Sequence, residues 1–244
     1  TEQECLDRLA KDDSRKDKKL FERLIKEYYA DKNRRNRTMQ DNMEIRAFNF
    51  EVRAQNDEEH GTYIEGTPIV YDSWTDLGWY DEVIDRGALD DTDLKDVRFL
   101  VNHNTDMIPL ARSRNNNENS TMQMSVGDEG MHIRVNLDTE NNAEAKALYS
   151  AIERSDISGM SFMFVVDGDR WEDESSEHPK RHIERISKVF EVSAVTFPAY
   201  EATNISARGL ADALDNAKAS LENVRAEKRR IELQKQKIRI MSEV

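Results

Sequence analysis

The stretch ISGMSFMFVVDGD, Ile157–Asp169, decides the fold class, because a Gly-x-Ser sequence leads into a run rich in aromatic and β-branched residues. Such runs favour a β-strand. The polar segment EDESSEHPK follows at 172–180, and two further strand-like segments, RHIERISK and VFEVSAVTFPAY, follow it. Strands that succeed one another without intervening helices predict an antiparallel β body rather than the βαβ alternation of a nucleotide-binding sheet.

More strand patterns precede this stretch. The segments STMQMSV and MHIRVNLD flank the turn GDEG at 127–130 and predict a hairpin. The segment NAEAKALYSAIERSD at 142–156 predicts a helix, because its apolar residues form a stripe. The stripe consists of Ala143, Ala147, Leu148, Ala151 and Ile152. The other strand-like segments are MEIRAFNFEVRA at 43–54, TYIEGTPIVYDS at 62–73, with Gly66 and Pro68 interrupting it, and VRFLVNHN at 97–104.

Three regions of different composition predict the domain organisation. Residues 1–42 are mostly charged, with apolar residues at helical spacing, and predict a helical N-terminal extension. Residues 43–208 hold nearly all strand patterns and form the predicted β domain. Residues 209–244 carry an apolar heptad, which predicts a coiled-coil-like helix that self-associates or packs on another chain; alternatively the helix folds back on the β domain. The heptad residues are Leu210, Leu214, Ala217, Leu221, Val224, Ile231 and Ile238, and Lys228 and Lys235 replace apolar residues in its second half.

The composition argues against several classes of protein. The 244 residues include 35% charged residues, with a net charge of -13, so we expect one compact domain with solvated helical extensions. The acidic balance disfavours nucleic acid as a partner, because phosphate binding relies on Lys and Arg. No apolar run approaches the ~18 to 20 residues of a membrane span. The single cysteine, Cys5, rules out a disulfide framework.

The five histidines differ in their sequence context. His60 lies in a polar turn and His132 within a predicted strand, and both are interpreted as structural. His178 and His182 have an H-x-x-x-H spacing, but a proline interrupts it and a third ligand is lacking, so we predict no metal and no cofactor. His103 directly follows the apolar run VRFLV. Because the end of a strand is a rigid support that can face a cleft, His103 is a candidate catalytic base.

Ser161 and Glu191 are two further candidates. Gly159 relieves crowding ahead of Ser161, and neighbouring backbone N–H groups there could form an oxyanion site. A second glycine after the serine is missing, so the segment is not a G-x-S-x-G nucleophile elbow. Ser161 is then either a nucleophile or a polar residue where a loop enters a strand, and Ser158 is a rival. Glu191 interrupts an apolar strand and requires a partner, either an imidazole or an arginine such as Arg185.

Six segments, taken in order, resemble one family. They are GTPIVYDS, EVIDRGALDD, VRFLVNHN with IPLAR, DEGMHIRVNLD, ISGMSFMF and FEVSAVTFPAY. With them the sequence resembles the prohead proteases of tailed bacteriophages, also called head maturation proteases, which are distantly similar to the herpesvirus assemblins. The resemblance covers Arg46–Ala207, about two thirds of the chain. It implies an α+β fold that is mainly antiparallel, with a compact β-barrel and surrounding helices.

The motifs of this family fall on three candidate positions. The histidine of its n-H-d motif falls on His103, with Asn104 in place of the usual acid. The serine of its S-f-g-F motif falls on Ser161, with Met163 in place of the small residue. Its E-v-S-l-V-x-x-P-A motif begins at Glu191, whereas the assemblins use a second histidine, which this segment lacks. The resemblance therefore implies a nucleophilic Ser161, His103 as general base and Glu191 as the group that orients the imidazole.

The resemblance also implies a function, a serine endopeptidase that needs no cofactor. Its implied substrates are the major capsid protein precursor, the scaffolding protein and the protease itself, cleaved inside the procapsid in the host cytoplasm. The oxyanion donors stay open between backbone N–H groups and the side chains of Arg112 and Arg114. The alternative is a non-catalytic capsid-assembly or scaffolding protein built on a protease-like barrel.

Overall fold

The structure, a computed structural model, describes residues 43–48, 52–58, 60–196 and 207–242. The chain divides into two units, Thr1–Asp41 and Asn42–Val244, and all described residues belong to the second. The predicted helical extension over 1–42 therefore lies outside the described residues.

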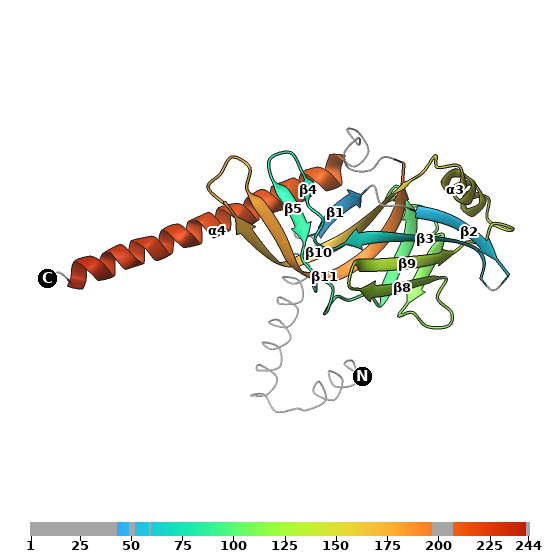
Figure 1. Cartoon of the computed structure of the whole chain (residues 1–244), viewed down its shortest axis with the longest axis horizontal. Helices are drawn as coiled ribbons and strands as arrows, with labels where there is room; N and C mark the ends of the chain where they lie inside the picture. The colour runs from blue at the N-terminus through green and yellow to red at the C-terminus, as the bar shows by residue number, and fades with distance from the viewer. Residues whose placement is uncertain (1–42, 49–51, 59, 197–206, 243–244) are drawn as a thin grey trace, which may run out of the picture. The chain divides into compact units, whose positions relative to one another are not determined.

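A long antiparallel hairpin forms the centre of a seven-stranded sheet (Figure 1). Its strands are β10 (Gly159–Glu172) and β11 (Lys180–Val195). The first half of β11 pairs in parallel with β5 (Asp81–Ile84), and its second half pairs in parallel with β6 (Asp96–Val101). Three strands complete this sheet. Strand β1 (Met43–Phe48) pairs with β10. Strand β4 (Thr75–Asp76) pairs with β5, and strand β7 (Ala111–Arg114) pairs with β6.

A second sheet of four strands has the order β2-β3-β9-β8. Its predicted hairpin is confirmed, because β8 and β9 pair in register around a tight turn. Gly130 opens β9 with φ +138, and a Cβ there would lie 2.0 Å from the carbonyl oxygen of Ile69 on β3. Only glycine fits this close approach between two strands. The strands are β2 (Val52–Asp57), β3 (Gly61–Val70), β8 (Met122–Gly127) and β9 (Gly130–Asn136).

Side chains of both sheets share one hydrophobic core. Phe162 and Phe164 of β10 and Val192 of β11 contribute from the larger sheet, and Ile64 and Ile133 contribute from the smaller one. All five are fully buried. Because side chains alternate along a strand, the residues between them point to the opposite face of the seven-stranded sheet.

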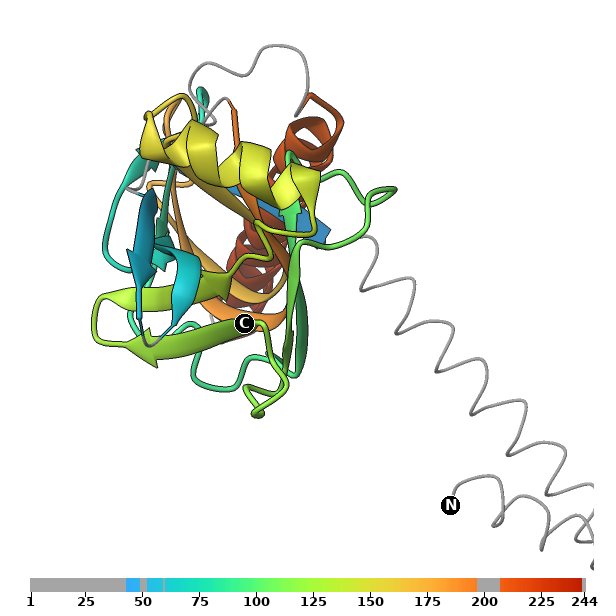
Figure 2. The ribbon, with the colours of Figure 1, turned by 90° about the vertical axis from the view of Figure 1, so that its right-hand side faces the viewer.

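Two helices accompany the sheets within the described residues. The predicted internal helix is confirmed as α3 (Ala143–Glu153), which Asn142 caps at its N-terminus and which lies next to β2 (Figure 2). The C-terminal helix α4 (Ala207–Ser242) contacts β1 and β10, and it buries Ala217 and Leu221. In the part of the chain that the structure describes, neither helix has the length and apolar composition needed to cross a membrane.

Two expectations about the strands are wrong. The described strands form two separate sheets, not a closed barrel. The segments of β7 and β8 share hydrogen bonds, among them that from the N–H of Thr121 to the carbonyl of Arg112 at 3.0 Å, but β7 and β8 do not pair as strands. The segment 43–54 is not one strand, since β1 and β2 belong to different sheets. The sheets remain mainly antiparallel, as predicted.

Candidate active site

His103 lies in a strained turn directly after β6. Asn102 and His103 have φ values of 52 and 56, a left-handed conformation that is uncommon for residues other than glycine. The side chain of Asn102 holds the turn on the end of β11, because it donates to the Thr196 hydroxyl at 3.0 Å and accepts from the Thr196 N–H at 2.9 Å. Strain of this kind persists where the surrounding structure fixes it, and such residues cluster at functional sites.

The imidazole of His103 contacts the carboxylate of Glu191. The distance from Nδ1 of His103 to Oε1 of Glu191 is 2.5 Å. The two residues come together because Glu191 pairs in register with Arg98 of β6, and the turn after β6 then brings His103 back over the sheet. Both side chains are largely buried, so the pair is shielded from water. In the described part of the chain, the other ring nitrogen of His103, Nε2, is buried without a hydrogen-bond partner.

Ser193 completes this pair. Its hydroxyl donates to Oε2 of Glu191 at 2.6 Å and accepts from the backbone N–H of His103 at 3.1 Å. Ser193 and Glu191 are two residues apart on β11, so their side chains share one face of the sheet. The serine therefore ties the carboxylate, the strand and the histidine turn to one another.

Ser161 lies on the neighbouring strand and on the same face. Its Cα is the register partner of Ser193, so the two side chains point the same way. Ser161 is fully buried, and its hydroxyl donates to the backbone carbonyl of Arg46 on β1 at 2.7 Å. The structure thus joins His103 to Glu191 and places Ser161 one strand away, with its hydroxyl engaged by β1.

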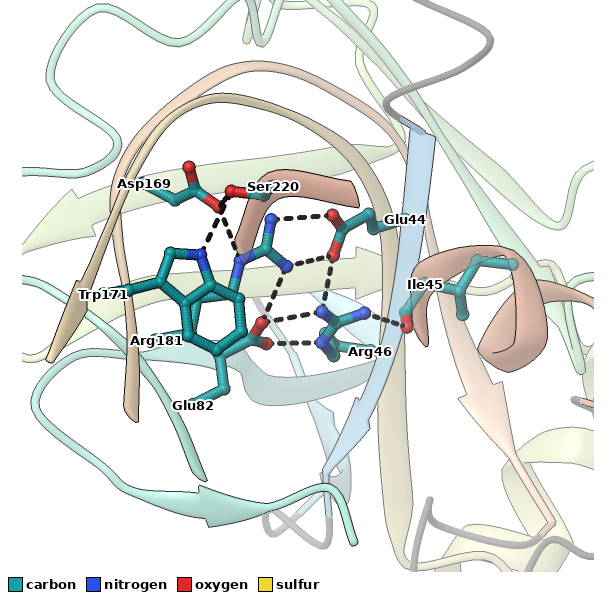
Figure 3. A network of polar contacts seen from close by, with 8 residues as sticks. All are labelled: Glu44, Ile45, Arg46, Glu82, Asp169, Trp171, Arg181 and Ser220. Atoms are coloured by element: carbon teal, nitrogen blue, oxygen red, sulfur yellow. Dashed lines mark hydrogen bonds and ion pairs between the residues drawn. The ribbon is translucent and has the colours of Figure 1, made fainter. Parts of the chain in front are cut away.

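Charged side chains buried between β1, β5 and the central hairpin hold β1 in place (Figure 3). Arg46 of β1 donates from Nε to Oε1 of Glu82 at 2.5 Å and from Nη2 to Glu44 at 2.5 Å. Arg181 of β11 donates to Glu44 at 3.0 Å, to Glu82 at 3.1 Å and to Asp169 at 2.8 Å. These five residues, Glu44, Arg46, Glu82, Asp169 and Arg181, are called the ion network below.

The ion network shifts the pKa values of its members. Burial alone would raise the pKa of Glu82, but the charges of Arg46 and Arg181 outweigh it and hold this pKa below its ordinary value. Burial alone would lower the pKa of Arg46, but Glu82 and Glu44 hold it well above its ordinary value. Glu82 and Arg46 therefore stabilise each other in their charged forms, and the buried arginines require their carboxylate partners.

The remaining residues considered from the sequence lie elsewhere. His178 contacts Asp81 at 3.0 Å and His182 contacts Asp85 at 2.8 Å, so the H-x-x-x-H pair does not share a partner. Arg112, a possible oxyanion donor, is paired with Asp96 on the neighbouring strand. The guanidinium of Arg185, which the sequence offered as a partner for Glu191, contacts Asp167.

Ser193 and the ion network were not predicted from the sequence. Ser193 follows Glu191 by two residues, and the alternation of side chains along a strand is sufficient to place it beside that carboxylate. The ion network has no comparable pattern in the sequence, because its members come from four separate segments. The alternating charged residues of β1 are, moreover, a pattern that is typical of an exposed face of a strand.

Comparisons with known proteins give one family match. The sequence profile of the caudovirus prohead serine proteases matches residues 48–218. A solved structure, the bacteriophage T4 capsid assembly protease gp21, aligns with 15% sequence identity and a TM-score of 0.34, covering 63% of this chain and 99% of that chain. No curated protein matches the chain.

Proposed function

Because the chain belongs to the family of caudovirus prohead serine proteases, we propose that it is a serine endopeptidase that uses Ser161, His103 and Glu191. The observation that carries this proposal is the buried contact of 2.5 Å between His103 and Glu191. It leaves the second ring nitrogen of His103 without a partner among the described residues, over the sheet face that holds Ser161. This arrangement suits an imidazole that one carboxylate orients and that accepts a proton from a serine.

The reaction is acyl transfer. The Ser161 hydroxyl attacks a peptide carbonyl while His103 takes its proton at Nε2, and the imidazolium then donates that proton to the leaving amine. Glu191 keeps Nδ1 protonated and stabilises the positive charge that develops on the ring. The first step requires the Ser161 hydroxyl to leave the Arg46 carbonyl, to which it now donates, and to turn towards His103.

The substrates are proteins of the immature capsid. The family supports the major capsid protein precursor, the scaffolding protein and the protease itself as targets, cleaved inside the procapsid in the host cytoplasm. Such a protease acts on neighbours already concentrated in the same shell, so its own affinity for a target sequence need not be high.

The C-terminal helix provides a route to self-association. Ala217 and Leu221 of the heptad are buried against the body, whereas Ile231, a heptad residue further along α4, is 42% exposed. An apolar stripe that leaves the body is stabilised when another helix covers it. We assign this distal part of α4 to contact with a second copy of the chain.

Substitution of the proposed nucleophile tests the function. The Ser161→Ala variant, co-expressed with a capsid precursor, is expected to lose more than roughly a thousandfold in cleavage rate, because the nucleophile is gone. Ser158→Ala is the matched control, since Ser158 is exposed, three residues away and outside the proposed site. Mass spectrometry of the products measures cleavage, and circular dichroism checks that both variants fold. Undiminished cleavage by Ser161→Ala would rule out the assignment.

The second candidate is a non-catalytic assembly protein. The burial of Ser161 and its bond to the Arg46 carbonyl favour it, because a nucleophile has to be reached by its substrate. It predicts that neither the natural chain nor Ser161→Ala processes a capsid precursor. It also predicts that both support head assembly equally well.

A further inference from the structure

The charges of the chain are divided unequally between the β body and helix α4. Residues 43–206 contain 33 acidic and 15 basic residues, so the body carries a net charge of -18. Residues 225–235 of α4 contain five basic and two acidic residues and are called the basic stretch below. Because opposite charges on two surfaces favour their encounter, the basic stretch of one copy is attracted to the acidic body of another.

The body already binds the start of the basic stretch through an acidic turn. Arg225 donates from Nε to the backbone carbonyl of Glu174, between β10 and β11, at 2.7 Å. Lys228 contacts the carboxylate of the same residue. From 226 to 235 every residue of α4 is exposed, and Lys235 has no ion pair among the described residues. One end of the basic stretch is thus held by its own body, and the other end is open to a partner.

Lys228, Ile231 and Lys235 share one face of the helix. They are three and four residues apart, which places their side chains next to one another. Ile231 is 42% exposed and lies between the two lysines. A protein surface can cover the isoleucine and pair with the lysines, whereas the phosphates of a nucleic acid pair with the charges alone. This face therefore suits an acidic protein surface better than a nucleic acid.

The α4 helix of a second copy does not suit this face. Lys228 and Lys235 occupy heptad positions, so a pair of α4 helices would place lysines in its apolar seam. Such a pair would also bring two basic stretches together, and like charges repel. An acidic surface avoids both costs, because each lysine that meets a carboxylate has its charge paired.

We propose that the basic stretch of α4 docks on the acidic β body of a second copy, and not on the α4 helix of that copy. The contact rests on the proposed function, which assigns this part of α4 to a second copy, and the new element is the surface that it meets. Ile231 supplies the apolar contact, and Lys228 and Lys235 pair with aspartates and glutamates of the other body.

The response to salt distinguishes the two kinds of contact. In analytical ultracentrifugation, the dissociation constant of the natural chain is expected to rise about tenfold or more between about 50 and about 500 mM NaCl, because salt screens opposite charges. A pair of basic helices would respond in the opposite direction, since salt would screen their repulsion. Association that tightens with salt would overturn the proposal, and so would a chain that stays monomeric at low salt.

Charge reversal on the two sides of α4 tests the face. Lys235→Glu is expected to raise the dissociation constant at low salt by about fivefold to tenfold, because it places a carboxylate against the acidic body. Arg229→Glu is the matched control, since it makes the same charge change at an exposed position on the side of the helix opposite Ile231. It should change the dissociation constant by less than about twofold. Equal weakening by both variants would contradict docking through this face.

An apolar substitution separates the two partners directly. Lys235→Leu restores an apolar residue to the heptad, so a pair of α4 helices would associate more tightly. Docking on an acidic body loses a cation instead, and Lys235→Leu should then weaken the association at low salt. Tighter association of this variant would overturn the proposal. Circular dichroism checks that each variant keeps its helix.

Cross-linking identifies the surface that α4 meets. A carbodiimide joins a lysine to a carboxylate in contact with it, and a mixture of isotope-labelled and unlabelled natural chain separates links between copies from links within one. Links from Lys228 or Lys235 to acidic residues within 43–206 of the other copy are expected. Links confined to Glu222, Glu227 and Glu232 of the other α4 would contradict the proposal.

Nucleic acid is tested with a fluorescent DNA duplex. Fluorescence anisotropy is expected to show no binding that Lys235→Glu abolishes. Such binding, with the association of copies unchanged by the substitution, would assign the basic stretch to nucleic acid instead. None of these measurements uses catalysis, so a negative result leaves the proposed roles of Ser161, His103 and Glu191 as they are.

Discussion

Ser193 determines how well the imidazole and its carboxylate are fixed. It bonds to the Glu191 carboxylate at 2.6 Å and accepts the His103 N–H at 3.1 Å, and it is fully buried. Because a hydrogen bond to a charged group is worth about 1.5–3 kcal/mol, the loss of this hydroxyl lets both partners move. Ser193 is therefore a positioning residue, whose effect on the reaction passes through His103 and Glu191.

Ser193→Ala is expected to lower kcat by about tenfold to a hundredfold at nearly constant KM, because it misplaces the base without changing the binding surface. Ser193→Thr keeps the hydroxyl and should recover part of the rate. Ser187→Ala is the control, since Ser187 lies on the same strand and its hydroxyl makes a long contact of 3.5 Å to the Val165 carbonyl. Steady-state kinetics on one peptide substrate separates kcat from KM. Equal losses in both alanine variants would indicate a general effect on the sheet.

At the residue scale, the sequence predicted His103 and Glu191 through the resemblance, and the structure brings them into contact. It did not predict that the Ser161 hydroxyl donates to the carbonyl of Arg46, because that bond depends on the pairing of β1 with β10 across more than a hundred residues. Pairing over such a distance depends on the whole fold, whereas local motifs reflect only neighbouring residues.

At the element scale, local patterns predicted well and long-range pairing did not. The hairpin β8–β9 and helix α3 follow from turn residues and spacing within a short segment. The two parallel pairings of β11 and the division of segment 43–54 between two sheets have no local pattern. They depend on pairing between segments that lie far apart in the sequence, as the closure of a barrel does, so local patterns do not predict them.

The ion network makes the attachment of β1 sensitive to acid. Since the folded pKa of Glu82 lies below its ordinary value of 4.5, this group stabilises the fold above pH 4.5. That contribution is lost as the pH falls through the lowered pKa. Glu82→Gln is expected to lower the free energy of unfolding at neutral pH by about 3–5 kcal/mol, because it leaves buried guanidinium groups with too few partners. It should also weaken the dependence of the free energy of unfolding on pH below pH 4.5.

Asp96→Asn is the matched control for that prediction. Asp96 also pairs with an arginine on a neighbouring strand, but it is 40% exposed where Glu82 is 3% exposed. An exposed pair contributes about 0–1 kcal/mol, so the control should unfold nearly as the natural chain does. Urea unfolding at several pH values gives both free energies. If both variants lower the free energy of unfolding by a similar small amount, the burial of the ion network does not increase its contribution to stability.

At the scale of the whole molecule, a continuous set of contacts connects α4 to the candidate nucleophile. Ser220 of α4 accepts from the Trp171 ring N–H at 3.1 Å and donates to Asp169 at 2.7 Å, and Asp169 holds Arg181. Arg181 shares Glu44 and Glu82 with Arg46, whose carbonyl binds the Ser161 hydroxyl. The buried part of α4 therefore supports β1, whereas its exposed residue Ile231 lies in the part that we assign to contact with a second copy.

Substitutions of two heptad residues in α4 separate these tasks. Leu221 is buried against Tyr80 and Trp171, so Leu221→Ala should lower the free energy of unfolding by about 2–5 kcal/mol and speed hydrogen exchange in β1. Ile231 is 42% exposed, so Ile231→Ala should leave both unchanged and instead weaken the association of copies, as measured by analytical ultracentrifugation. If Leu221→Ala lowers the free energy of unfolding but leaves hydrogen exchange in β1 unchanged, the ion network does not couple the stability of β1 to α4. If Ile231→Ala does not change the association, the exposed part of α4 around Ile231 does not hold a second copy.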